Sequence, residues 1–305
     1  MKQISIIGTS EIAKEHIKAI LANKTKIYSI STTRKNSKKL NSLKKKFRIE
    51  KIFKNWKECV RETSKKNCSL LIASRTIDTF KIINYANKFK IKIFVEKPLS
   101  ENVDHFNKLK KNFNNIFVGY NRLFYNNVIY LKKRLKKIDN VLVKCPEFNA
   151  KDIVLNSAHV VSIILHLFGK IKILSKVRNK NSIVVLSKNS KNVPICFIFP
   201  LKSTNNFSIE INEGKTKFLL EPIEVLKIYE NFKVKYIKNR KKLKVVNPIL
   251  KREYSEFSFN NFKPGFYNQF WYFKNVFFKI DKKEKLNNLN FAKQVVTICN
   301  YFLKK

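Results

Sequence analysis

The chain has 305 residues, of which 44% are hydrophobic and 28% charged, a composition typical of a soluble globular protein large enough for two domains. Its formal net charge is +44, and nearly all of the excess is lysine spread along the chain, with only nine arginines. Specific recognition of phosphates and bases favours the forked arginine guanidinium, so a solvated lysine surface explains the charge better than a nucleic-acid partner. No apolar run approaches the ~20 residues that span a membrane, and the N-terminus lacks a signal-peptide pattern, so we expect a cytoplasmic protein.

Cysteine and glycine usage indicate which covalent links and which turns the chain can contain. The five cysteines are scattered and never paired as C-x-x-C, which favours reduced core cysteines over a disulfide framework or a metal site. Only five glycines are present, where average usage of about 7% would give roughly twenty. Such a chain should keep glycine where a side chain is sterically excluded or φ is positive. Gly214, in INEGKTKF, is therefore predicted to form a hairpin turn.

Short apolar strands alternate with helical patterns over the first 120 residues, which predicts βαβ units in a parallel, doubly wound sheet. The predicted strands, in chain order, are 3–7, 26–32, 47–53, 68–74, 90–95 and 115–121. The predicted helices are 14–24, a lysine-rich segment around Leu40 to Phe47, 56–63, 79–89 and 102–113.

The pattern changes after about residue 125, where a helix at 126–137 precedes a run of strands with short connections. These strands are predicted at 140–148, 170–178, 182–187, 193–200, 207–212, 216–221 and 224–230, interrupted by a helix at 156–169. Two helices, 266–278 and 290–305, close the chain, and 233–264 is left unassigned. We therefore predict an α/β fold with a Rossmann domain over 1–122. An α/β domain with a mainly antiparallel open sheet follows over 123–305, and its last helices could pack back on the first domain.

The stretch IIGTSEIA joins the first strand to the first helix and contains Gly8-x-Ser10-x-x-Ala13. In the dinucleotide-binding fingerprint the first glycine forms the tight turn, and the third position, where alanine is accepted, allows helix–strand packing. The helix N-terminus would hold the pyrophosphate through its free N–H groups and its dipole. Ser10 departs from the second glycine of the pattern. We predict cofactor binding by Gly8, Ser10, Glu11, Ile12 and Ala13.

The end of the second strand reads SISTTRKNSKK and has no acidic residue. An acid at this place accepts the ribose hydroxyls of NAD, whereas a basic or small polar group accommodates the extra phosphate of NADP. We therefore predict NADP(H) rather than NAD(H), with Thr33 as a hydroxyl donor and Arg34 as a planar clamp. The alternative is that Arg34 is one more surface cation.

The order of IIGTSEIA, LLIASRTIDT, FVEKPLS, VGYNRLF and AHVVSIILHLFG resembles the glucose-fructose oxidoreductase / inositol dehydrogenase (Gfo/Idh/MocA) family over essentially the whole chain. Its most specific elements are EKP after a strand and GYNR some twenty residues later. The resemblance implies that Glu96 lies near the nicotinamide ribose and that Lys97 reaches the substrate. An ammonium group there would polarise the growing carbonyl and assist departure of the hydroxyl proton. Pro98 would fix the local backbone.

The resemblance also implies that His159 is a general acid/base, a role suited to an imidazole that titrates near physiological pH. Many relatives have aspartates four residues before and three residues after this histidine, where this chain has Leu155 and Ser162. Asn156 could orient the ring but would not stabilise an imidazolium as a carboxylate does. His166 is expected to be an ordinary packed histidine. The remaining predicted site residues are Ser74 and Arg75 for the cofactor, and Tyr120, Asn121, Arg122 and Asn156 for the substrate.

These patterns together predict an NAD(P)-dependent oxidoreductase that passes hydride between nicotinamide and a hydroxyl carbon of a sugar or sugar derivative. By analogy with relatives, sugar-nucleotide or surface-polysaccharide metabolism is the expected setting. An open sheet normally buries a face against another subunit, so a homodimer or homotetramer is expected. No metal or membrane partner is expected. Two alternatives stay open: a catalytically impaired dinucleotide-binding sensor or scaffold of the same fold, and a nucleic-acid binder.

Overall fold

The computed structural model describes residues 3–34, 37–109, 114–237, 240–258, 262–281 and 285–304. These residues form two compact units. The first contains residues 1–124 and 260–301, and the second contains residues 125–259 and 302–305, so the division falls within the last helix.

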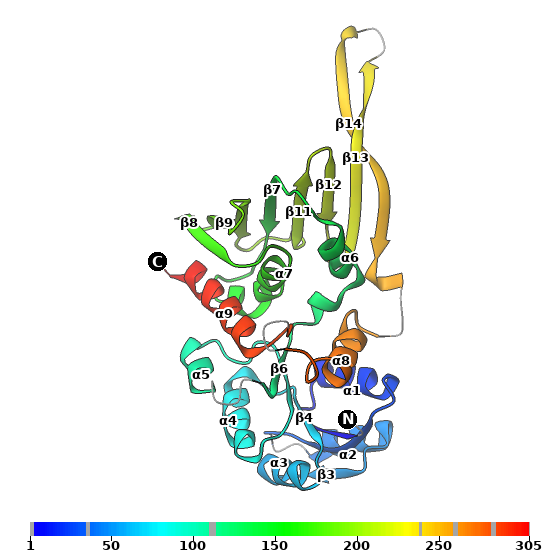
Figure 1. Ribbon diagram of the computed structural model, residues 1–305, viewed down its shortest axis with the longest axis vertical. Helices are drawn as coiled ribbons and strands as arrows, with labels where there is room; N and C mark the ends of the chain where they lie inside the picture. The colour runs from blue at the N-terminus through cyan, green and yellow to red at the C-terminus, as the bar shows by residue number, and fades with distance from the viewer. Residues whose placement is uncertain are drawn as a thin grey trace. The chain divides into compact units, whose positions relative to one another are not determined.

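A six-stranded parallel sheet, ordered β3-β2-β1-β4-β5-β6, is the centre of the first unit (Figure 1). Its strands are almost continuously apolar and buried, because helices cover both faces of a parallel sheet. The strands are β1 (Gln3–Ile7), β2 (Lys26–Ser31), β3 (Lys51–Phe53), β4 (Ser69–Ile72), β5 (Ile93–Glu96) and β6 (Ile116–Gly119). The predicted strand at 47–53 is thus shorter than expected, since residues 37–47 form a helix.

Helices connect these strands in the alternating order predicted from the sequence. They are α1 (Glu11–Ala22), α2 (Ser37–Phe47), α3 (Trp56–Lys65), α4 (Thr76–Ala86) and α5 (Val103–Lys108), with 3₁₀ turns η1 (Asn87–Phe89) and η3 (Asn121–Phe124). The second half of the predicted helix 102–113 falls partly on residues outside those described.

Two helices from the end of the chain, α8 (Phe266–Asn275) and most of α9 (Leu289–Leu303), complete the first unit. An aromatic cluster connects α8 to the sheet, because Phe273 packs against Phe94 of β5 and Phe117 of β6 with ring centroids 5.2 and 5.6 Å apart. The backbone N–H of Val118 also donates to the carbonyl of Asn287 at 2.8 Å. The aromatic packing makes α8 part of the core of the first unit, and the Asn287 contact attaches the segment before α9 to β6.

The second unit is built on an eight-stranded sheet ordered β14-β13-β12-β11-β7-β10-β9-β8, in which only the β7–β10 pair is parallel among the described strands. Helices α6 and α7 pack together beside this sheet (Figure 1). The elements are α6 (Asn126–Arg134), β7 (Asn140–Lys144), η4 (Ile153–Ser157), α7 (Ala158–Phe168), β8 (Ile171–Arg178), β9 (Ser182–Asn189), β10 (Pro194–Pro200), β11 (Ser208–Glu213), β12 (Thr216–Leu220), β13 (Val225–Ile237), β14 (Arg240–Ser255) and η5 (Glu256–Ser258). The predicted fold class, a Rossmann domain followed by a mainly antiparallel sheet, is confirmed.

The sheet contains two hairpins in the segments where the sequence predicted a turn or left the structure open, β11–β12 and β13–β14. Gly214 has φ of +57° in the β11–β12 turn, as predicted. The segment left unassigned, 233–264, contains the end of β13 and all of β14; the two strands pair along their length and extend beyond the other strands (Figure 1). The segment was hard to assign because it is rich in lysine, a residue that is depleted in strands. No helix among the described residues has the length and hydropathy needed to cross a membrane.

Candidate functional site

The turn between β1 and α1 is sterically closed around Gly8. Its φ is +145°, and a Cβ atom built there would lie 2.2 Å from the carbonyl oxygen of Ala73. The Gly8 N–H donates to Ser31 O at 2.9 Å, and the Ala73 N–H donates to Ile7 O at 2.8 Å, so β2 and β4 both hold this turn. It lies between β1 and β4, where the strand order reverses, which is the usual ligand position in open α/β sheets.

Helix α1 begins directly after this turn. Ser10 is its N-cap residue, and its Oγ accepts a hydrogen bond from the Ala13 N–H at 3.2 Å. The departure from the glycine pattern therefore has a local reason, because a serine caps the helix where a glycine would not. Glu11 is exposed and forms a 2.6 Å ion pair with Lys14, and that hydrogen bond lowers the pKa of the Glu11 carboxyl. A glycine turn followed by a helix N-terminus fits the pyrophosphate of a dinucleotide.

The end of β2 has a carboxylate neighbour that the sequence analysis missed. Thr33 Oγ1 donates to Asp78 Oδ2 at 2.9 Å, and Arg75 donates to the same oxygen from Nε at 3.1 Å and Nη2 at 3.0 Å. Asp78 lies in the first turn of α4, so the fold brings an acid to a strand end that has none of its own. Arg34 is exposed beside this group, and its backbone N–H donates to Thr32 Oγ1.

The side chains in the loop after β4 form hydrogen bonds within the loop and with the first turn of α4. Ser74 Oγ lies 3.1 Å from Thr79 Oγ1, which in turn donates to the Arg75 carbonyl at 3.0 Å. These bonds order the start of α4. Ser74 and Arg75, two of the predicted cofactor residues, lie at the same edge of the sheet as Gly8, because all three follow the carboxyl ends of parallel strands.

Glu96, at the end of β5, is held by a histidine from α1. The Nε2 atom of His16 lies 2.6 Å from Glu96 Oε2, and the His16 side chain is fully buried. The imidazole packs against Phe94 and Phe266, with ring centroids 5.1 and 4.7 Å away, and its Nδ1 has no hydrogen-bond partner among the described residues. Nε2 is therefore the atom that donates to the carboxylate. Lys97, the next residue, is half-buried.

The GYNR segment after β6 is largely internal. Tyr120 is fully buried, packs edge-on against Phe291, and has its pKa raised well above 10 by burial. Asn121 is 5% exposed and donates from Nδ2 to the Pro264 carbonyl at 3.0 Å. Of the three predicted substrate contacts here, the half-exposed Arg122 is the one whose exposure suits a ligand.

His159 and Asn156 belong to the second unit, whereas the other predicted site residues belong to the first. His159 is the second residue of α7 and is half-buried, and its carbonyl accepts a hydrogen bond from Ser162 Oγ at 2.6 Å. The side chain of Asn156 is bonded to an acid, because its Nδ2 donates to Oε2 of Glu147 at 3.2 Å. The sequence analysis missed Glu147, which lies in the segment after β7.

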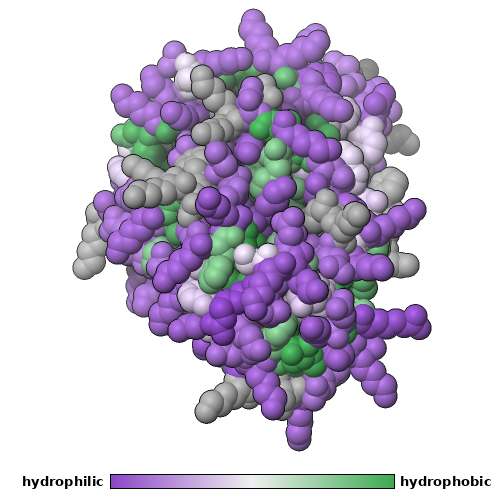
Figure 2. Space-filling view, turned by 60° about the horizontal axis from the view of Figure 1, so that its bottom comes forward, coloured by the Kyte–Doolittle hydropathy of each residue, from purple (hydrophilic) through white to green (hydrophobic). Residues whose placement is uncertain are grey.

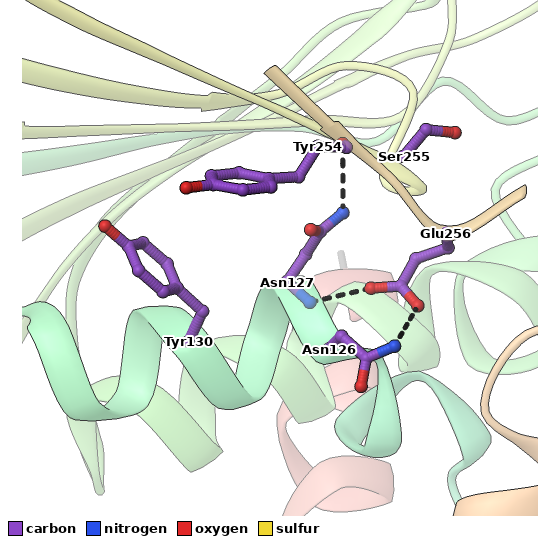
Figure 3. Close-up of a pocket in the computed structure, with 6 residues that line it drawn as sticks. All are labelled: Asn126, Asn127, Tyr130, Tyr254, Ser255 and Glu256. Atoms are coloured by element: carbon purple, nitrogen blue, oxygen red, sulfur yellow. Dashed lines mark hydrogen bonds between the residues drawn. The ribbon is translucent and has the colours of Figure 1, made fainter. Parts of the chain in front are cut away.

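A cavity of about 430 Å³ in the second unit is lined by Asn126, Asn127, Tyr130, Tyr254, Ser255 and Glu256 (Figure 3). The buried Glu256 carboxylate accepts hydrogen bonds from the Asn127 N–H at 2.7 Å and from Asn126 Nδ2 at 3.4 Å. Asn127 Nδ2 donates to the carbonyls of Glu224 and Tyr254. The polar groups of this cavity therefore bond to one another and cap α6, which is a structural role.

A larger hollow, of about 930 Å³, lies at the opposite, N-terminal edge of the parallel sheet. Five lysines are among its lining residues: Lys24, Lys26, Lys66, Lys90 and Lys92. Lys66 and Lys90 directly follow α3 and η1, and Lys24 lies two residues after the end of α1; cations at these places offset the negative end of the helix dipole. The molecular face in Figure 2 is likewise mostly hydrophilic, with separate hydrophobic patches. The lysines have a structural explanation and do not define a ligand site.

The cysteines form no disulfide bond; four are buried and Cys196 is half-buried. Within the ranges that the structure describes, no group of three or more His, Cys, Asp or Glu residues could hold a metal ion.

Residues 2–120 match the family described as "Oxidoreductase family, NAD-binding Rossmann fold" (GFO_IDH_MocA). A comparison with curated proteins found no match. Among solved structures, the dehydrogenase MviM from Clostridium difficile is 18% identical with a TM-score of 0.74, and the match covers 98% of both chains. UDP-N-acetylglucosamine 3-dehydrogenase GnnA from Acidithiobacillus ferrooxidans is 11% identical with a TM-score of 0.72, covering 99% of both chains.

A third solved structure, from Desulfitobacterium hafniense and named as an NADPH-dependent oxidoreductase, is 10% identical with a TM-score of 0.77; the match covers 98% of this chain and 94% of that one. At these identities the likeness shows a shared fold over the whole chain. The family match rests on the N-terminal unit, where the Gly8 turn and the capped helix lie. The match of residues 2–120 to the Gfo/Idh/MocA oxidoreductase family, with its NAD-binding Rossmann fold, confirms the resemblance found in the sequence.

Proposed function

We propose that the protein is an NADP(H)-preferring oxidoreductase that transfers hydride between the nicotinamide and a hydroxyl carbon of a sugar or sugar derivative. The observation that carries the proposal is the Gly8 turn, where backbone contact with Ala73 leaves no room for a side chain directly before the N-terminus of α1. The N-terminus of α1, which begins directly after this turn at the C-terminal edge of the sheet, can hold a pyrophosphate through its free N–H groups.

The preference for NADP(H) is supported by the charges at the end of β2. Arg34 and Arg75 are both exposed there, and Asp78 is the one carboxylate bonded to this group among the described residues. Because Asp78 already accepts from Arg75 and Thr33, its capacity to accept from a ribose hydroxyl is reduced. The remaining positive charge of Arg34 suits the 2′-phosphate of NADP, which a guanidinium can bind bidentately.

The proton chemistry is assigned to Lys97 and His159. The bound nicotinamide would supply or accept the hydride. Lys97 follows Glu96, whose carboxylate His16 holds in place, so the segment at the end of β5 is ordered before any ligand arrives. We propose that the Lys97 ammonium polarises the reacting C–O group and that His159 holds the exchanged proton. Arg122 is the proposed substrate contact of the GYNR segment.

A sugar or sugar nucleotide is the proposed substrate class. One similar fold, GnnA, is named for its action on UDP-N-acetylglucosamine. Anionic groups on such a substrate would be attracted by the strongly positive charge of this chain.

Self-association through the second unit is also proposed. Strand β9 alternates strictly, with Ile183 and Val185 buried and Val184 and Leu186 on the opposite face, 36% and 40% exposed. The neighbouring Val177 of β8 is 68% exposed and pairs with Val184. An exposed apolar sheet face of this kind is typical of subunit contacts. Light scattering should therefore give a dimer or tetramer, and Leu186→Lys should shift it toward monomer; a wild-type monomer would refute this part.

The test of the proposed function is a fluorescence titration of the purified protein with NADPH and with NADH. Arg34→Ala should weaken NADPH binding by about tenfold or more, the value of one charge-assisted hydrogen bond, and leave NADH binding nearly unchanged. Arg61→Ala is the matched control, since Arg61 is an exposed arginine on α3 that contacts Tyr85. Failure of either cofactor to bind would refute the proposal, and equal loss for both cofactors would refute the role of Arg34.

Turnover is tested next, with the bound cofactor and a panel of sugars and sugar nucleotides. Lys97→Met should retain cofactor binding within about twofold and lose most of kcat, because it removes a group that acts in the transition state. Binding without any turnover by the wild-type protein would instead favour a dinucleotide-binding sensor or scaffold.

A further inference from the structure

Glu147 is a buried carboxylate with an unusual set of partners. It is 3% exposed, although acidic residues are rarely buried without a specific partner. Ser157 Oγ donates to Oε1, Asn156 Nδ2 donates to Oε2 at 3.2 Å, and the Ser157 backbone N–H donates as well. Burial raises the pKa of the Glu147 carboxyl in spite of these bonds.

All three donors belong to the π-helical turn η4 that leads into α7. Two residues after Ser157 comes His159, on the first turn of α7. Ser157 has helical dihedrals, so α7 continues directly from η4, and the Ser157 hydroxyl is free to donate to Glu147 instead of capping the helix. Single π-turns are energetically poor and occur most often at functional sites, so this one needs a group that holds it.

The segment that contains Glu147 is itself firmly attached to the sheet. The Glu147 N–H donates to Pro200 O at 3.0 Å, and the Lys202 N–H donates to Glu147 O at 2.8 Å. Glu147 also forms a parallel bridge with Leu201. The carboxylate is therefore a fixed point from which the turn before His159 can be positioned.

We propose that Glu147 is the positioning residue for His159: it gathers Asn156 and Ser157 and so sets the turn from which the imidazole extends. This inference rests on the proposed function, in which His159 holds a proton. It also bears on Leu155, which occupies a place where an acid would orient the histidine directly. In this chain the negative charge instead reaches the same turn from the segment after β7.

The chain contains its own control, because Glu256 caps α6 in nearly the same way. Glu256 is 5% exposed, accepts from the backbone N–H groups of Asn126 and Asn127 and from Asn126 Nδ2, and has its pKa raised by burial. Glu147→Gln and Glu256→Gln therefore each remove the charge of a buried carboxylate that accepts hydrogen bonds from a helical segment. They differ in whether a proposed catalytic residue follows.

The first measurement is kcat per cofactor-binding site, with the cofactor Kd measured in parallel. Glu147→Gln should lower kcat by about 10- to 100-fold, the effect of a catalytic group displaced by a fraction of an ångström to 1 Å, while the cofactor Kd stays within about twofold. Glu256→Gln should change the melting temperature by an amount comparable to that of Glu147→Gln and keep kcat within about twofold of the wild type. Equal losses of kcat in both variants, or no loss in Glu147→Gln, would overturn the proposal.

The second measurement does not depend on activity. In protein labelled with ¹³C-histidine, the His159 ring signal can be assigned from the spectrum of His159→Gln, since the chain has four histidines. Glu147→Gln should shift this signal, and Glu256→Gln should leave it in place. If the wild-type protein turns over no sugar, the proposed function fails while this signal still decides whether Glu147 controls His159. An unshifted His159 signal in Glu147→Gln would overturn the inference.

A rescue completes the design. Leu155→Asp in the Glu147→Gln background returns a carboxylate to the same turn, and it should recover part of the lost kcat. Asp152→Asn is the comparison, because Asp152 is a nearby carboxylate that accepts from the Asn149 N–H and has no bond to Asn156 or Ser157 among the described residues. A loss of kcat in Asp152→Asn equal to that in Glu147→Gln would show a general charge effect and overturn the proposal.

Discussion

Replacing Gly8 by alanine should disrupt the first unit because of contacts with backbone rather than with movable side chains. The new Cβ would meet the Ala73 carbonyl at 2.2 Å for oxygen and 2.7 Å for carbon, both far inside van der Waals contact. Those atoms belong to the end of β4, which is hydrogen-bonded to β1 and β5, so they cannot move away independently. The φ of +145° adds strain for any residue with a Cβ.

The expected magnitude follows from these two effects. Overpacking against a fixed neighbour costs about 1–3 kcal/mol and a disallowed φ about 1–3 kcal/mol, so Gly8→Ala should lower the free energy of unfolding by about 2–6 kcal/mol. That is a large part of the ~5–15 kcal/mol of an ordinary domain. Gly214→Ala is the control: φ is +57°, no atom lies within 4 Å of its Cβ, and only about 1–2 kcal/mol of left-handed strain remains.

The assay is urea unfolding followed by far-UV circular dichroism and by tryptophan fluorescence. Both tryptophans, Trp56 in α3 and Trp271 in α8, belong to the first unit, so fluorescence reports the unit that contains Gly8. Gly8→Ala should shift the fluorescence transition to much lower urea and weaken cofactor binding. Gly214 lies in the second unit, so the effect of Gly214→Ala is followed by circular dichroism. A loss of stability in Gly8→Ala no larger than the loss in Gly214→Ala would refute the argument that backbone contact with Ala73 requires glycine.

Three further outcomes are expected. Burial, with a contribution from Lys132, lowers the pKa of His166 to about 4. Because the unfolded histidine titrates near 6.5, the free energy of unfolding should fall as pH drops from 6.5 toward 4. Urea unfolding of His166→Gln should lack this dependence on pH. Burial raises the pKa of Glu256, so the folded state retains its proton more strongly and stability should fall as pH rises above about 4.5; Glu256→Gln should show no such fall in the same urea series. Asp78→Asn should strengthen NADPH binding several-fold relative to NADH by releasing Arg75 from its carboxylate, and a gain for NADH instead would reverse the assignment of this cluster.

The fold could be predicted from the sequence because each of its signals is local. The strands of the first unit are short continuous apolar runs between amphipathic helices, and Gly8 marks the turn after the first of them. The antiparallel unit follows from alternating runs such as 182–187, where every second residue is buried. The second half of the β13–β14 hairpin was harder to predict, because 233–255 is rich in lysine and contains Pro248, and neither residue is typical of a paired strand.

Contacts between distant residues in the candidate site could not be predicted in the same way. His16 and Glu96 are 80 residues apart, and Thr33 and Asp78 are 45 apart, so no pattern in one segment indicates its partner. His16 did carry a signal, since it occupies the buried face of α1 together with Ala13 and Ile17, where an imidazole needs a polar partner. For Tyr120 the motif predicted a ligand contact, but tertiary packing, which the motif does not encode, buries the side chain completely.

The distribution of acidic residues gives the strongest reason to look for function beyond the motifs. The chain has 21 acidic residues against 65 basic ones, so any carboxylate at the surface has abundant lysine nearby and no special meaning. Burial of a carboxylate is costly, and a chain this rich in cations gains nothing from placing one inside unless specific donors are to be held there. Glu147 and Glu256 are the acids that are buried among the described residues. Glu256 accepts from the first residues of α6, and Glu147 accepts from Asn156 and Ser157 in the turn that leads into α7. No proposed catalytic group lies at the start of α6, so Glu256 is expected only to stabilise that helix. His159 lies in the first turn of α7, so Glu147 is expected to position a catalytic group as well.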